Sequence, residues 1–107
     1  MEGIEIPYEA TDVESNWAIY AIRVLDGKLL KVRDALRAEG IECNTHYHPL
    51  HINSYYRNMI RCREEDFPTA NKIYSTLLRL PMYPQLIRQD LDSIIAAVKK
   101  VMSLCHF

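Results

Sequence analysis

The sequence predicts an α/β (α+β) domain of two layers, in which helices cover one face of a small sheet of about three strands. Three observations lead to this fold class. One segment is apolar on both of its alternating faces, as in a buried strand. The C-terminal segment repeats apolar residues at helical spacing, and glycine and proline separate the segments between them. The expected order is β-α-β-α-α-β-α, and the 107 residues correspond to one domain.

The N-terminal part of the chain is expected to hold an arm and then a strand. Residues 1–15 show little periodicity and carry Pro7, Thr11, Asp12, Glu14 and Ser15, so we interpret them as an arm or linker and residues 16–107 as the domain. Asn16–Leu25 alternates between two apolar faces, which predicts a central strand covered on each side. Asp26-Gly27 should end this strand.

A helix and a second strand are expected next. In Lys28–Glu39 an apolar stripe consists of Leu29, Val32 and Leu36, with Leu30 at its edge. Gly40 stands where a left-handed residue commonly ends a helix. Ile41–His46 is predicted to be a strand that stops before Pro49.

The middle of the chain is expected to form two short helices and an extended piece. Asn53–Met59 is predicted to be helical, and the charged residues 61–66 should be a surface loop. Asp66 is predicted to cap a helix that has Pro68 in its first turn and runs to about Leu77. Arg79–Tyr83 lies between prolines and should be extended.

The last helix has the clearest periodicity. Its apolar stripe comprises Leu91, Ile94, Ile95, Val98, Val101, Met102 and Cys105. Ile94 and Ile95 are both expected to be buried, so truncating either to alanine should cost about 2–5 kcal/mol.

Charge and cysteine usage exclude several classes of partner. The net charge is −1, so neither nucleic acid nor an anionic membrane is an expected partner. Cys43, Cys62 and Cys105 lack the spacing of a disulfide framework or a zinc ribbon, which favours reduced thiols. The N-terminus has no apolar signal segment, and no apolar run approaches the roughly 20 residues of a membrane span. A cytoplasmic location is therefore expected.

The sequence offers no catalytic or cofactor-binding residue of its own. A Schiff-base lysine must be desolvated or lie beside another cation, but all five lysines lie among polar neighbours on predicted helices. The three glycines are isolated, so they form no phosphate-binding loop. Cys43 and the nearby histidines share one short strand, which argues against a thiol–imidazole pair.

Three histidines lie within six residues of one another, at His46, His48 and His51. One interpretation is a metal site, because positions 46 and 48 share a strand face and Glu42 is nearby. Another is the polar lining of a cleft or interface, to which Tyr47 adds a hydroxyl group. The sequence leaves both interpretations open.

The order of several motifs resembles a known family. The motifs, spread over about residues 15–104, are the Asn16–Leu25 strand, Glu39-Gly40-Ile41, His46-Tyr47-His48-Pro49-Leu50-His51, Tyr55-Tyr56-Arg57, Asp66-Phe67-Pro68-Thr69-Ala70, Leu80-Pro81-Met82-Tyr83-Pro84, and Asp90 with the final helix. In this order they resemble the C-terminal small domain of the DegT/StrS-type sugar aminotransferases. Ala18, where that family commonly has histidine, and Gln85-Leu86-Ile87, which cannot supply the usual helix cap, depart from its pattern.

The resemblance implies a role for the chain. Members of the family are pyridoxal-phosphate enzymes that aminate a nucleotide-linked keto-sugar, as in cell-envelope polysaccharide biosynthesis. Their cofactor and its lysine belong to a large N-terminal domain, so this chain is expected to line the substrate side of the cleft and to be inactive alone. The resemblance assigns substrate binding to His46, Tyr47 and His51, and neither catalytic, cofactor nor metal residues to this chain.

Two further expectations follow. The partners implied are the large pyridoxal-phosphate-binding domain and the nucleotide sugar, and a chain lacking that domain should self-associate through its exposed apolar face. The alternative is a free-standing α/β binding module that holds a metal or small ligand at His46, His48 and His51.

Overall fold

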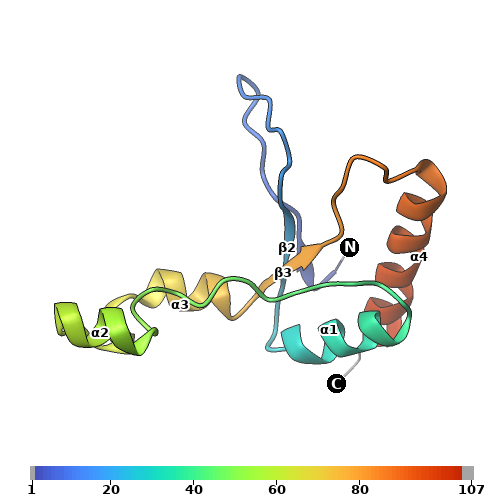
Figure 1. Cartoon of the computed structure of the whole chain (residues 1–107). Coiled ribbons are helices and arrows are strands. Elements are labelled where there is room, and N and C mark those ends of the chain that lie inside the picture. Colours follow the sequence, from blue (N-terminus) through green and yellow to red (C-terminus); the bar gives the residue numbers. More distant parts are fainter. Residues whose placement is uncertain (1, 105–107) are drawn as a thin grey trace.

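A sheet of three antiparallel strands forms the centre of the fold. The computed structural model describes residues 2–104, and Figure 1 shows its strands: β1 (Ile4–Glu5), β2 (Tyr20–Val24) and β3 (Leu77–Leu80). The strand order is β1-β2-β3, so β2 is central, as predicted. Ile22 pairs with Leu78 across β2 and β3, and Ile4 pairs with Val24 across β1 and β2. The small α+β sheet confirms the expected fold class.

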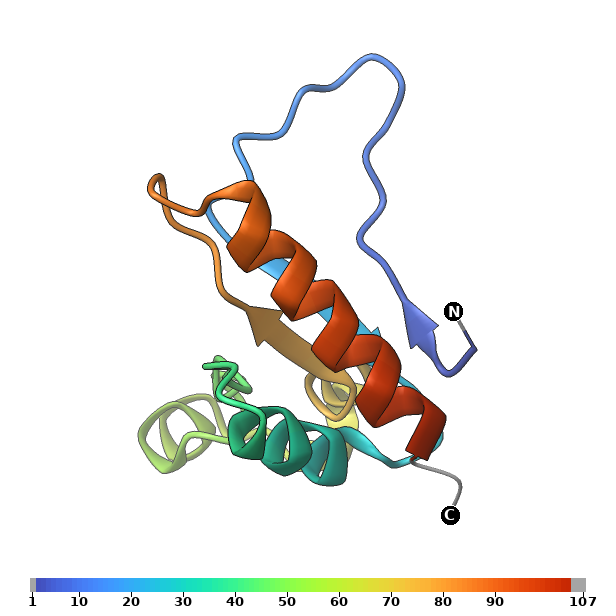
Figure 2. The same ribbon diagram turned by 90° about the vertical axis from the view of Figure 1, so that its right-hand side faces the viewer.

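Two helices cover one face of this sheet. Figure 2 shows α4 (Arg88–Leu104) lying across the strands, with α1 (Leu29–Ala38) beside its C-terminal half. Alternation along β2 turns Ile22 and Val24 toward the helices. The buried apolar residues form one cluster: Ile22, Val24, Leu29, Val32, Leu36, Cys43, Leu78, Ile94, Ala97, Val98 and Val101. This cluster is the hydrophobic core.

Left-handed residues form the two turns around α1. Asp26 and Gly27 have φ of 62° and 70°, which ends β2 where the sequence predicts. Gly40 has φ of 85° after the helix. Its N–H donates to the Arg37 carbonyl at 3.0 Å, and the Ile41 N–H donates to the Leu36 carbonyl at 3.0 Å. This pattern is a Schellman cap, which requires glycine because a side chain disfavours positive φ.

The middle of the chain forms an extension that projects from the sheet (Figure 1). It contains α2 (Ser54–Ile60), the 3-10 turn η1 (Glu64–Asp66) and α3 (Pro68–Tyr74). Neither α2 nor α3 contains a buried residue. The extension therefore owes little of its stability to apolar burial within the described chain.

The predicted strands are partly wrong. Ile41–His46 is not a strand, because only Asn44 pairs, through a bridge to Arg79. The third strand is instead β1, which lies in the segment interpreted as an arm and is too short to show periodicity. β2 is shorter than Asn16–Leu25, and only its inner face is buried. β3 begins two residues before Arg79, because α3 ends early at Tyr74 and the chain joins the sheet at once.

Several predicted side-chain roles also differ. Asp66 does not cap α3, because its carboxylate accepts a hydrogen bond from the Arg63 N–H at 2.8 Å. Leu30 is exposed at the edge of the stripe. Ile94 is 9% exposed and Ile95 is 41% exposed, so only Ile94 is buried as predicted. Leu91 is also exposed, and the prediction for Cys105 lies outside the described residues.

Candidate functional site

The segment that carries the three histidines starts from a firmly held point. The Asn44 N–H donates to the Arg79 carbonyl at 3.2 Å, and the Arg79 N–H donates to the Asn44 carbonyl at 2.8 Å. Arg37 on α1 donates to the Cys43 carbonyl through Nε at 3.1 Å and Nη2 at 2.9 Å, and Nη2 also lies 3.1 Å from Asn44 Oδ1. The planar guanidinium suits such a fork of acceptors. These contacts fix the residue from which the histidine segment departs.

Beyond Asn44, two aromatic side chains face outward together. The rings of His46 and Tyr47 stack with centroids 4.8 Å apart and an angle of 24°. Both residues are exposed, and Tyr47 is 70% exposed. The pair therefore presents an imidazole, a phenol hydroxyl and aromatic faces that a sugar or nucleotide can contact.

The three histidines do not meet at one point. His48 lies against Tyr74, with ring centroids 5.4 Å apart, and His51 lies against Phe67, with centroids 4.7 Å apart. Within residues 2–104, no group of three histidine, cysteine or acidic side chains is arranged to hold a metal ion. The geometry therefore gives no support to the metal-site interpretation.

His51 differs from the other two because its ring points inward. It is 6% exposed, and its Nε2 lies 2.5 Å from Asn71 Oδ1 on α3. Sequence reasoning missed Asn71, which lies twenty residues further along the chain. The motif around Phe67 and Pro68 indicated a helix there, but nothing in the sequence indicated which of its side chains meets His51.

The buried Cys43 is not suited to nucleophilic chemistry. Its Sγ lies 3.6 Å from the Arg33 carbonyl oxygen in the core. Burial is the largest effect on the thiol and raises its pKa above the usual value, although Arg37 and Arg33 oppose the shift. Because the thiolate is the nucleophilic form, this thiol is unreactive at neutral pH.

The described residues do not fit a pyridoxal-phosphate site. Lys31, Lys72, Lys99 and Lys100 are exposed, and Lys28 is half-buried where α1 begins. None of the five lines the apolar pocket that the sheet forms with the N-terminal half of α4 and that Tyr20, Leu80 and Leu91 help to line. The left-handed glycines terminate separate turns and do not form a phosphate-binding loop.

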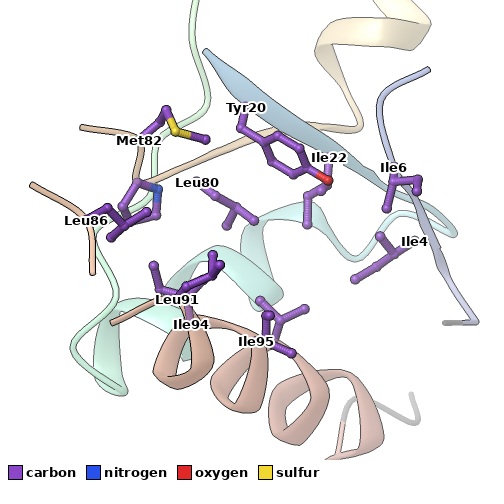
Figure 3. Close-up of a pocket in the computed structure, with 12 residues that line it drawn as sticks. Ile4, Ile6, Tyr20, Ile22, Leu80, Met82, Leu86, Leu91, Ile94 and Ile95 are labelled. Atoms are coloured by element: carbon purple, nitrogen blue, oxygen red, sulfur yellow. The ribbon is translucent and has the colours of Figure 1, made fainter. Parts of the chain in front are cut away.

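A concave surface lies between the sheet and the N-terminal half of α4 (Figure 3). It is an apolar pocket with a volume of about 340 Å³. Its lining includes Ile6, Tyr20, Leu80, Met82, Leu91 and Ile95. The exposed Leu91 and Ile95 belong to this surface, which explains why a helical stripe continues beyond the core.

The sequence model of one protein family matches nearly the whole chain. This family is the DegT/DnrJ/EryC1/StrS aminotransferase family, and the match covers residues 1–99. The spore coat polysaccharide biosynthesis protein SpsC of Bacillus subtilis is 32% identical over 105 residues, which are 94% of this chain and 27% of the relative. The dTDP-3-amino-3,4,6-trideoxy-alpha-D-glucose transaminase of Streptomyces venezuelae is 30% identical over 101 residues, 94% of this chain and 26% of the relative.

Solved structures show the same relation. The crystal structure of S. venezuelae DesV in complex with a ketimine intermediate is 31% identical in sequence and has a TM-score of 0.80, over 92% of this chain and 26% of DesV. The putative sugar aminotransferase Spr1654 of Streptococcus pneumoniae, in its PMP form, is 27% identical in sequence and has a TM-score of 0.83. The match covers 95% of this chain and 26% of Spr1654. The chain thus spans about a quarter of the length of these relatives. Within residues 2–104, no helix has both the length and the apolar character needed to span a membrane.

Proposed function

The chain belongs to the DegT/DnrJ/EryC1/StrS aminotransferase family, and we propose that it serves as the small domain of a pyridoxal-phosphate-dependent sugar aminotransferase. The observation that carries the proposal is the family match over residues 1–99 in a chain whose described residues do not fit the cofactor. A large domain supplies the cofactor, its lysine and its electron-sink chemistry. The chain alone is inactive in this scheme.

His46 and Tyr47 contact the substrate in this proposal. Their exposed, stacked rings start from the segment held by Arg37 and Arg79, so their position is well defined. The imidazole and phenol groups donate and accept hydrogen bonds with sugar hydroxyl groups, and the ring faces pack against the flat base of a nucleotide. His51 serves the same side of the cleft indirectly, since its ring is buried.

The proposed substrate is a nucleotide-linked keto-sugar, and the proposed pathway class is polysaccharide biosynthesis of the cell envelope. One relative is named as a dTDP-amino-sugar transaminase and another as a spore coat polysaccharide biosynthesis protein, which supports both choices. A cytoplasmic location suits the free thiols Cys43 and Cys62.

The apolar pocket beside α4 is the proposed contact for the large domain. Ile6, Met82, Leu91 and Ile95 are exposed there, and covering them would remove an apolar surface from water. A chain without that domain is expected to self-associate through the same surface. Self-association should disappear when Leu91 and Ile95 are both replaced by polar residues.

A chimera tests the proposed function. This chain would replace the matching quarter of the S. venezuelae dTDP-3-amino-3,4,6-trideoxy-alpha-D-glucose transaminase, and amination of nucleotide-linked keto-sugars would be assayed. We expect amination by the chimera and none by the lone chain. A chimera that folds and holds its cofactor, but aminates none of a panel of such sugars, contradicts the proposal.

Variants of the chimera test the contact residues. His46→Ala and Tyr47→Ala are each expected to raise KM for the sugar about tenfold, which corresponds to about 1.4 kcal/mol of lost binding. His48→Ala is the matched control, because His48 belongs to the same segment but lies against Tyr74. An equal rise in KM for all three variants would contradict a specific role of His46 and Tyr47.

A further inference from the structure

His51 is an unusual residue in this fold. Among residues 2–104 it is the only buried polar or charged residue, and it lies between the exposed His46–Tyr47 pair and α2. Burying an imidazole is costly unless its nitrogen atoms find partners. The contacts of this ring should therefore explain why a histidine occupies the position.

The hydrogen bonds around Asn71 determine where the imidazole carries a proton. Asn71 Nδ2 donates to the Glu64 carbonyl at 2.8 Å, so the Oδ1 of the same amide faces the other way and can only accept. His51 Nε2 lies 2.5 Å from that oxygen. Nε2 must therefore be the protonated nitrogen that donates to Asn71.

This arrangement joins three segments that are separate in the chain. One amide side chain on α3 accepts from the His51 turn and donates to the main chain of η1. The Phe67 ring, between η1 and α3, packs against the imidazole at 4.7 Å. Because α2 and α3 bury no residues, this contact is a main link between the extension and residues 46–50.

We propose that His51 is a positioning residue, which fastens the segment carrying His46 and Tyr47 to η1 and α3 through Asn71. The turn after Pro49 is also closed by main-chain bonds from Ile52 and Asn53 to the Pro49 carbonyl, at 3.0 Å and 3.3 Å. With both ends held, at Asn44 and at His51, the two exposed rings have a defined place. Only the purpose of that placement rests on the proposed function.

Two variants of the full chain test the inference. His51→Gln keeps a side-chain N–H donor near the position of Nε2, whereas His51→Leu keeps the bulk and removes the donor. We expect His51→Leu to speed amide hydrogen exchange in η1 and α3 about tenfold, the effect of losing one hydrogen bond. His51→Gln should restore most of the protection, and neither change should alter exchange in β2 or α4.

A nitrogen-15 spectrum of the imidazole groups gives an independent test on the unmodified chain. In this spectrum His51 should show a protonated Nε2. Proton spectra of the two variants give a further readout: the ring signals of His46 and Tyr47 should shift in His51→Leu but not in His51→Gln. His48→Gln is the matched control and should leave exchange in η1 unchanged, because the ring of His48 lies against Tyr74, the last residue of α3.

Three results would overturn the inference: an unprotonated Nε2 on His51, equal hydrogen exchange in His51→Gln and His51→Leu, or the same loss of protection of η1 in His48→Gln as in His51→Leu. If His51→Leu does not fold, the imidazole spectrum and the His51→Gln variant still decide. None of these measurements needs cofactor or sugar. An inactive chimera would therefore contradict the proposed function without affecting the positioning role of His51. Likewise, a failed exchange or imidazole test would contradict that positioning role without affecting the proposed function.

Discussion

The body and the extension of this molecule are stabilised in different ways. The body consists of the sheet with α1 and α4, and it contains almost every buried apolar residue. The extension consists of α2, η1 and α3, and its contacts are ring pairs, helix caps and the His51–Asn71 hydrogen bond. Apolar burial contributes more per residue than such polar contacts do. The body should therefore set the global stability, while the extension should open locally.

The sharpest test of this comparison is in α4. Ile94→Ala should lower the free energy of unfolding by about 2–5 kcal/mol, because it empties a site in the core. Ile95→Ala removes the same atoms from an exposed position and should cost less than about 1 kcal/mol. Urea denaturation of both variants measures the difference. Equal losses would mean that Ile95 is covered in solution, as by self-association.

The Schellman cap of α1 gives the next largest effect. Gly40→Ala should destabilise the body by about 1–2 kcal/mol, because φ of 85° is unfavourable for a residue with a Cβ. No atom lies within 4 Å of the added Cβ, so the cost is conformational rather than steric. Gly40→Asn should lose less, since asparagine tolerates this region. Thermal unfolding compares the two variants, and equal losses would contradict this cause.

The Cys43 thiol adds a pH dependence to the body. Its pKa is raised in the folded chain, mainly by burial, so its contribution to stability is complete below the unfolded pKa of about 9 and falls as pH rises beyond it. The slope from this group cannot exceed about 1.4 kcal/mol per pH unit. Urea denaturation of the wild type and of Cys43→Ala, from neutral to alkaline pH, isolates the contribution of this thiol. The free energy of unfolding should fall less with rising pH in the variant. An identical pH dependence in the two proteins would contradict burial of the thiol.

The smallest expected global effect is in the extension. Asn53 Oδ1 accepts from the Tyr55 N–H at 3.0 Å and caps α2. Asn53→Ala should weaken α2 by about 1 kcal/mol locally, while global unfolding changes by less than about 0.5 kcal/mol. Hydrogen exchange in α2 measures the local change, and urea denaturation measures the change in global stability. As a control, Asn53→Ser should preserve the helix cap. A global loss as large as that of Ile94→Ala would show that body and extension unfold together.

Local sequence pattern was enough to predict the two long helices, the central strand and the end of α1. The stripe of Leu29, Val32 and Leu36 gave α1, the longer stripe gave α4, and an apolar segment gave the central strand around Ile22. Gly40 marked its helix end because only a residue without a side chain adopts that conformation freely. The family, too, was recognisable from the order of motifs, and the match over residues 1–99 bears it out.

Features that depend on residues distant in the sequence became clear only from the three-dimensional packing. β1 is a strand because Ile4 meets Val24, and two residues are too few to carry a period. Residues 41–46 have strand-like composition, but only Asn44 reaches a partner strand. Ile95 follows the same stripe as Ile94, yet the packing of the sheet leaves it open. The sequence suggested that His51 contacts substrate, whereas in the structure its ring is buried and forms a hydrogen bond with Asn71. Local sequence cannot show that Asn71 lies opposite this ring. Periodicity tells which face of an element is apolar, but burial is decided by what packs against that face.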